Sequence, residues 1–197
     1  MRRFTAYALV CALAALSTGC SSPPAKFYTM SAGAAPTATP SHISVMVGPV
    51  SVPSVIDRPQ IVVTTGGNQV AIDEFRRWAS PIQDNLARVV ADDLGAILGT
   101  SRVTLYQSQI GAEVDYRVQI EVRNFESAPG KYALLEALWS VRRLKDGKTE
   151  TGRTVIRESV ESESFDALAA AHSRSIAKMT QEIVGALRRL VSDPLTL

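Results

Sequence analysis

The stretch YRVQIEVR, residues 116–123, alternates apolar and polar side chains at every position. Such alternation is typical of a β-strand with one face buried and the other in water. Two further strand patterns follow, over residues 132–144 and 151–160, and KDGK at residues 145–148 lies between them. Because an Asp-Gly pair is a strong signal for a tight hairpin, these segments predict consecutive antiparallel strands.

Shorter strand patterns precede this run. Residues 43–50 alternate, residues 61–72 contain two apolar runs around Gly66-Gly67, and residues 102–106 form a short strand pattern. Because glycine tolerates the positive φ of tight turns, the Gly pair predicts a second hairpin. The chain therefore has enough strands for a sheet.

Two segments carry the 3.6-residue period of amphipathic helices. The first opens with Ser80 as the expected N-cap and Pro81 as the expected first helical residue, and it ends near Gly99. The second is an apolar stripe over residues 165–190. Two such helices suffice to cover one face of a sheet. The predicted fold is an α+β two-layer sandwich, with a mostly antiparallel sheet and both helices packed on one face.

The N-terminal residues have the features of an export signal. Arg2 and Arg3 precede an apolar run over residues 4–16, which is shorter than the roughly 20 residues of a membrane span. A positive start, an apolar core and small residues before a cleavage point define a secretory signal. Cys20 directly follows Thr-Gly, as in lipoprotein signals, although Ser17 stands where an aliphatic residue is usual. We predict lipidation of Cys20; an ordinary cleaved signal or an N-terminal anchor is the alternative.

Processing at Cys20 determines the charge and the domain organisation. Removing the signal, residues 1–19, removes two Arg and no acid, so 21 basic against 19 acidic residues become 19 against 19. A neutral chain lacks the basic face of nucleic-acid-binding proteins. Residues 20–41, rich in Ala, Pro, Ser and Thr, are predicted as a flexible tether, and residues 42–197 as a single periplasmic domain. Ser21 favours the outer membrane, because Asp at this position retains many lipoproteins in the inner membrane.

Few residues in the sequence suit catalysis. The His residues are His42 and His172, far apart, and Cys20 is the only Cys after the signal. A nucleophile–base pair or a transition-metal site is therefore not expected. Asp92 and Asp93 are adjacent on a helix, where side chains diverge by about 100°, and are expected in solvent. We predict no enzymatic activity, no cofactor and no metal.

Two elements, DRPQIV and RWASP, combine charged, aromatic and proline residues; they begin at Asp57 and Arg77. Trp78 stands just before the predicted helix, where it could pack the start of the helix onto the sheet. Alternatively, Arg58, Pro59, Arg77 and Trp78 form a partner-binding patch, because Arg and Trp are enriched at interface hot spots.

These elements resemble those of the ABC-type transport auxiliary lipoprotein family, the paraquat-inducible protein C-like lipoproteins. The matching features are Cys20, the patch FYTM at residues 27–30, VSVP at residues 50–53, DRPQIV at residues 57–62 and RWASP at residues 77–81. The resemblance spans nearly the whole chain after the signal.

The resemblance implies a non-enzymatic lipoprotein on the periplasmic face of the outer membrane, within an envelope lipid-transport system. Its implied partners are a periplasmic MCE-domain (mammalian cell entry) protein and an inner-membrane ABC transporter or permease, with phospholipid as cargo and a ring-like homo-oligomer as assembly. Two alternatives remain open: a structural lipoprotein of a secretion or pilus assembly, and an envelope hydrolase.

Overall fold

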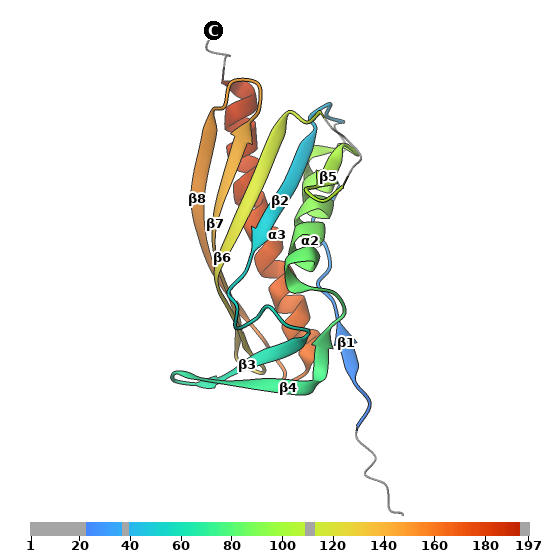
Figure 1. Cartoon of the computed structure of the whole chain (residues 1–197), viewed down its shortest axis with the longest axis vertical. Helices are drawn as coiled ribbons and strands as arrows, with labels where there is room; N and C mark the ends of the chain where they lie inside the picture. The colour runs from blue at the N-terminus through green and yellow to red at the C-terminus, as the bar shows by residue number, and fades with distance from the viewer. Residues whose placement is uncertain (1–22, 37–39, 109–112, 194–197) are drawn as a thin grey trace, which may run out of the picture.

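The computed structural model describes residues 23–36, 40–108 and 113–193; Cys20 and the predicted signal lie outside them. The described residues form a five-stranded sheet in the order β5-β2-β6-β7-β8, a three-stranded sheet in the order β1-β4-β3, and two helices (Figure 1). The elements are β1 (Lys26–Tyr28), β2 (Val45–Ser51), β3 (Gln60–Gly66), β4 (Gln69–Trp78), α2 (Ile82–Leu98), β5 (Val103–Leu105), β6 (Tyr116–Ala128), β7 (Tyr132–Arg143), β8 (Thr149–Ser159) and α3 (Phe165–Ser192).

The five-stranded sheet is mixed. Strands β6, β7 and β8 form the two predicted antiparallel pairs, whereas β2 runs parallel to both β5 and β6. The alternation that predicted the central strand appears directly in its burial: Tyr116, Val118 and Ile120 are buried, and Gln119 and Glu121 are exposed. One face of the sheet therefore belongs to the core.

Both helices lie on this buried face. Helix α3 packs on β6, β7 and β8, and α2 packs on β2, β5 and α3 (Figure 1). Leucines such as Leu86, Leu168 and Leu187 are fully buried between the layers, and each contributes about 1.5–3 kcal/mol relative to an exposed side chain. The predicted α+β two-layer arrangement is confirmed; the parallel pairing of β2 and the separate three-stranded sheet were not expected.

Trp139 on β7 depends on a glycine in the neighbouring strand. A Cβ at position 152 would lie 2.1 Å from Cζ2 of Trp139, so the indole ring occupies the space that only glycine leaves. The indole Nε1 donates a hydrogen bond to Oγ1 of Thr154 at 2.9 Å, and this hydroxyl donates to Glu182 of α3. Trp139 and Thr154 thus connect the sheet to α3 through Glu182.

The helix ends follow the sequence only in part. Helix α2 begins at Ile82, one residue later than expected, and no side chain caps it; instead the carbonyl of Pro81 accepts hydrogen bonds from the Asp84 and Asn85 amides. The expectation that Ser80 is the N-cap is therefore wrong. At the other end, the helix stops at Gly99 with φ of 62°, the left-handed conformation that favours glycine.

The N-terminal segment differs most from the prediction. Residues 26–28 form β1, and Met30 is fully buried. The amides of Gly33 and Ala34 both donate to Oδ1 of Asp93, at 2.9 and 2.8 Å. The expectation of a flexible tether over residues 20–41 is therefore wrong for residues 26–34, which are part of the folded domain.

Candidate functional site

Three sequence elements that are far apart in the chain meet in the three-stranded sheet. In the register of β1 and β4, Phe27 lies beside Arg77 and Tyr28 beside Trp78. The Trp78 amide donates to the Pro59 carbonyl at 2.7 Å, and the next amide, of residue 79, donates to the Tyr28 carbonyl at 2.8 Å. The FYTM, DRPQIV and RWASP elements thus form one structural unit at one end of the molecule (Figure 1).

Trp78 lies in the core beneath this sheet, with only 4% of its surface exposed. Its ring meets Phe125 and His172 edge-on, at centroid distances of 6.3 and 6.2 Å, and the latter two rings stack at 3.8 Å. Aromatic pairs of this kind contribute about 0.5–1.5 kcal/mol beyond their buried area. Of the two interpretations of Trp78, the structure supports packing, because a buried indole cannot itself contact a partner.

His172 and Ser127 form a buried polar pair in the same cluster. Nε2 of His172 lies 2.9 Å from Oγ of Ser127, a spacing that would suit a nucleophile and its base. However, both residues are buried, and burial lowers the pKa of His172 to about 3. The imidazole therefore stays neutral and is a weak base, and a substrate cannot reach the serine.

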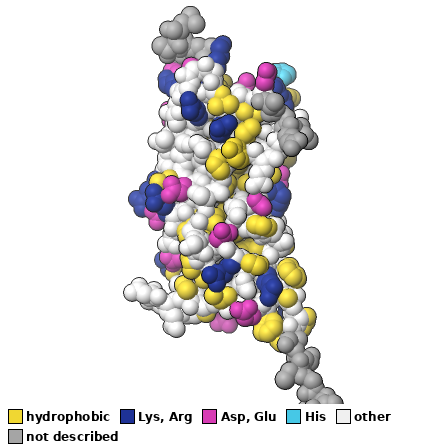
Figure 2. Space-filling view, in the orientation of Figure 1, with side chains coloured by type: hydrophobic (Ala, Val, Ile, Leu, Met, Phe, Trp, Pro, Cys, Tyr) yellow, Lys and Arg dark blue, Asp and Glu magenta, His cyan; other side chains and the backbone are white. Residues whose placement is uncertain are grey.

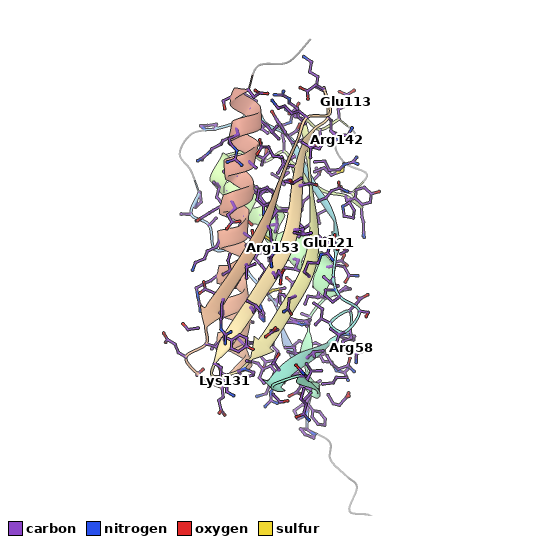
Figure 3. The ribbon with its side chains drawn as sticks, turned by 90° about the vertical axis from the view of Figure 1, so that its left-hand side faces the viewer. Arg58, Glu113, Glu121, Lys131, Arg142 and Arg153 are labelled. Carbon is purple, nitrogen blue, oxygen red and sulfur yellow. The ribbon has the colours of Figure 1, made fainter. Side chains whose placement is uncertain are left out.

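The other three predicted patch residues lie at the same end and reach the surface. Pro59 is exposed, whereas Arg58 and Arg77 are half-buried. Nε of Arg77 donates to the Glu74 carbonyl at 3.1 Å. Figure 3 shows Arg58 and Lys131 at this end of the molecule. A partner contact through Arg58, Pro59 and Arg77 stays a prediction. Trp78 supports these residues, because it is buried at the end of β4 next to Arg77 and its amide donates to the Pro59 carbonyl.

The face of the five-stranded sheet opposite the helices is open to solvent. A shallow hollow of about 710 Å³ lies on it and includes Glu121, Leu138 and Arg153 in its lining. Figure 3 shows Arg153 and Glu121 along the middle of the sheet. By register and exposure, five Arg outnumber three Glu on this open face: Arg117, Arg123, Arg142, Arg153 and Arg157 against Glu121, Glu126 and Glu136. Arg153 pairs with Glu136 at 2.8 Å.

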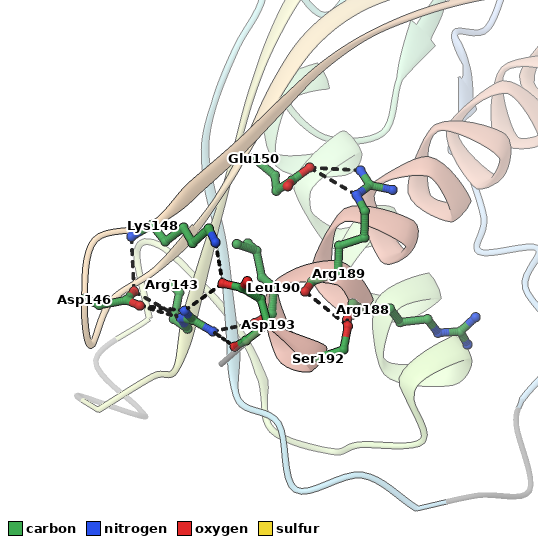
Figure 4. Close-up of polar contacts among 9 residues, drawn as sticks. All are labelled: Arg143, Asp146, Lys148, Glu150, Arg188, Arg189, Leu190, Ser192 and Asp193. Atoms are coloured by element: carbon green, nitrogen blue, oxygen red, sulfur yellow. Dashed lines mark hydrogen bonds and ion pairs between the residues drawn. The ribbon is translucent and has the colours of Figure 1, made fainter. Parts of the chain in front are cut away.

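A second charged cluster, at the end away from β1, holds the fold together. Arg143 pairs with Asp146 at 2.6 Å and donates to the carbonyls of Leu190 and Asp193 at the end of α3 (Figure 4). The guanidinium lowers the pKa of Asp146 to about 2. A cation at a helix C-terminus satisfies its free carbonyls, so this cluster is structural.

Asp93, which was expected in solvent, instead holds the N-terminal segment against α2. It is fully buried, and burial raises its pKa, although the Ala34 and Gly33 amides oppose this shift. A signal was available, because residues 89, 90 and 97 of the apolar stripe lie three or four positions away. Asp92, in contrast, is exposed as expected.

Neither a metal centre nor a membrane span is evident in the part of the chain that the structure describes. No group of three or more His, Cys, Asp or Glu there could hold a metal ion. No helix there is both long and apolar enough to cross a membrane.

Comparison with protein families identifies the chain. The profile of the ABC-type transport auxiliary lipoprotein component family matches residues 28–184. The chain belongs to this family. The matched range begins within β1 and includes the converging elements of the three-stranded sheet. Membership confirms the resemblance and makes the chain a lipoprotein-type auxiliary component of ABC-type transport.

Two solved structures share the fold, and a third is only distantly similar. Protein XCC0632 from Xanthomonas campestris, of family DUF330, is 23% identical with a TM-score of 0.65, covering 81% of this chain and 93% of its own. An uncharacterized protein is 14% identical with a TM-score of 0.69, covering 84% and 99%. A PelC dodecamer from Paraburkholderia phytofirmans is 14% identical with a TM-score of 0.40, covering 80% and 90%. No curated protein matches the chain.

Proposed function

We propose that this protein is a non-enzymatic, lipid-anchored subunit of an envelope lipid-transport system, on the periplasmic face of the outer membrane. It docks a periplasmic MCE-domain protein that works with an inner-membrane ABC transporter or permease. Family membership supports the transport role, and Cys20 after Thr-Gly supports the anchor.

The observation that carries the docking role is the open face of the five-stranded sheet. Helices cover one face of this sheet, and the other presents the hollow around Leu138 together with an excess of Arg side chains. Arg is enriched at interfaces because its planar guanidinium makes several directed hydrogen bonds and buries its stem. An excess of positive charge favours a partner surface that is acidic.

Charge reversal tests this docking surface. Arg142→Glu combined with Arg153→Glu is expected to abolish co-purification of the MCE-domain protein after mild crosslinking. Arg188→Glu, on the exposed side of α3, is the matched control and should leave capture unchanged. Equal capture by the native protein, the double variant and the control would contradict docking at the open face.

Lipidation is tested separately at Cys20. Cys20→Ser is expected to leave unprocessed or soluble protein, while the native protein fractionates with the outer membrane and carries an acyl mass increment. Stable anchoring needs two lipid signals, which a triacylated cysteine exceeds. A native protein without acyl mass would contradict the anchor.

The second candidate function is a structural lipoprotein of a secretion or pilus assembly. The same open face would serve such a role, so the partner that is recovered decides between them. Capture of a secretion component in place of an MCE-domain protein would favour this alternative.

A further inference from the structure

Large exposed hydrophobic side chains gather at the end of the molecule that carries β1. Of the nine in the described residues, five belong to β1, β4 or the loop before β3: Phe27, Val55, Val70, Ile72 and Phe75. We call these five residues the apolar end patch. Scattered hydrophobic residues are ordinary on a surface, but a group of them marks an interaction site.

The strand register places the core of this patch on one face of the three-stranded sheet. Along β3, residues 60, 62 and 64 point to the same side; their partners on β4 are Arg77, Ile72 and Val70. Phe27 of β1 lies beside Arg77 and therefore joins this side. Because Trp78 faces the core, the side of Arg77 faces outward on β1 and β4; on β3 this side is partly covered, since Val62 is only 8% exposed and belongs to the core. Phe27 is the most exposed member, with 64% of its surface free.

The sequence length between the predicted anchor and β1 limits where this face can lie. Lys26, the first residue of β1, follows Cys20 by six positions, and six extended residues span at most about 20 Å. The segment after β1 cannot lengthen this connection, because buried Met30 and the Asp93 hydrogen bonds fix it to the domain. A lipid on Cys20 therefore brings the apolar end patch close to the bilayer.

We propose that the apolar end patch rests in the interfacial region of the membrane that holds the Cys20 lipid, and that the three-stranded sheet is a second membrane contact. This inference rests on the proposed lipidation of Cys20. Apolar faces of peripheral proteins enter about 5–10 Å into the boundary between headgroups and acyl chains. Lys26 is exposed next to Phe27 at the start of β1, and such a long side chain can place its charge at lipid phosphates; Arg76 instead pairs with Asp73 at 2.6 Å.

The consequence is a fixed orientation of the domain. With the three-stranded sheet on the membrane, the opposite end points away from it (Figure 1). Figure 2 shows hydrophobic side chains around the β1 end of the visible face. The open face of the five-stranded sheet then stands upright in the periplasm, where a partner can approach it from the side.

Site-directed spin labelling of the full lipidated chain tests the contact. After the signal the native sequence has no Cys other than Cys20, so a nitroxide can be attached to single-Cys variants Phe27→Cys, Ile72→Cys and Phe75→Cys. Leu144→Cys and Val155→Cys are matched controls, because both native residues are exposed hydrophobics outside the patch. Each protein is measured in detergent and in vesicles of phosphatidylethanolamine and phosphatidylglycerol, and intact mass is recorded for every sample.

The expected result is a severalfold rise, on transfer to vesicles, in the ratio of oxygen to nickel-chelate accessibility at positions 27, 72 and 75, with no rise at 144 and 155. Acylated protein whose labels stay water-accessible at all five positions would overturn the membrane contact and leave the anchor intact. Protein without acyl mass would overturn both. Spin–spin broadening at position 72 that persists in detergent would overturn the contact in favour of a second copy of the chain.

Discussion

The two ends of the molecule are closed by different chemistry. At one end, Arg143 joins Asp146 to the last carbonyls of α3, and Lys148 pairs with Asp193 (Figure 4). At the other end, the three-stranded sheet turns Phe27 and other apolar side chains toward solvent. Paired charges are stable in contact with water, whereas each Å² of apolar surface left in water costs about 25 cal/mol of free energy relative to burial. The contrast shows that more large hydrophobic side chains are exposed at the β1 end than at the end that Arg143 holds together.

Trp78 gives the largest expected effect, because it holds the β1 end to the core. Trp78→Ala is expected to lower the free energy of unfolding by about 3–5 kcal/mol, while Arg58→Ala should change it by no more than about 0.5 kcal/mol. Urea denaturation of the two variants beside the native protein measures both. Equal losses would show that Arg58 belongs to the same packed unit.

His172 predicts a pH dependence for the same cluster. Its pKa is about 3 in the fold and 6.5 in the unfolded chain, so between these values the unfolded chain binds a proton that the folded chain does not. Stability therefore falls as the pH decreases from 6.5, by up to about 1.4 kcal/mol per pH unit. His172→Gln should remove this contribution while still reaching Ser127. Parallel stability curves for the two proteins from pH 7 to pH 4 would contradict the buried neutral imidazole.

Asp93 tests how firmly the segment after β1 is held. Asp93→Ala removes the acceptor of the Gly33 and Ala34 amides and should cost about 1–3 kcal/mol; hydrogen exchange of these two amides should accelerate. Asp93→Asn keeps an acceptor without the buried charge and should cost less. Because burial raises the Asp93 pKa, the stability that this group contributes is greatest below pH 3.8 and declines as the pH rises through the raised value. Slow exchange in Asp93→Ala would mean that other contacts hold the segment.

The smallest effect is expected at the patch itself. Phe27→Ser and Ile72→Ser should change the free energy of unfolding by less than about 0.5 kcal/mol, since Phe27 is 64% and Ile72 44% exposed. Leu144→Ser, at the opposite end, should change the free energy of unfolding by a similarly small amount. A loss well above 1 kcal/mol at Phe27 alone would indicate that the patch serves folding, and the difference between the ends would disappear.

The sequence predicted the large sheet and both helices because their periodicity is local. Burial of alternate residues along β6 and the Gly99 stop of α2 follow directly from patterns that a few neighbouring residues carry. The three-stranded sheet depends on contacts between distant segments, such as the Trp78 amide with the Pro59 carbonyl. A three-residue strand such as β1 has no periodicity of its own, and the residues on both sides of it have the composition of a linker.

The candidate site was predicted in the same uneven way. The residues that converge at the β1 end were identified from their unusual chemistry, but the sequence did not show that Trp78 faces inward and Arg77 outward. That distinction comes from the folded structure, in which Trp78 is buried and Arg77 is only half-buried. The open face was anticipated only as the uncovered side of a sheet, and its excess of Arg emerges when three strands are aligned in register.

We infer that the protein stands on the membrane at its β1 end and presents its open sheet face to an MCE-domain partner. Photo-crosslinking in cells tests both parts at once, with a benzophenone side chain in place of Leu138 on the open face, Ile72 in the patch or Gln181 on the outer side of α3. We expect position 138 to capture the MCE-domain protein, position 72 to capture lipid, and position 181 to capture neither. Capture of the MCE-domain protein from position 72 or 181, with none from 138, would contradict this inference.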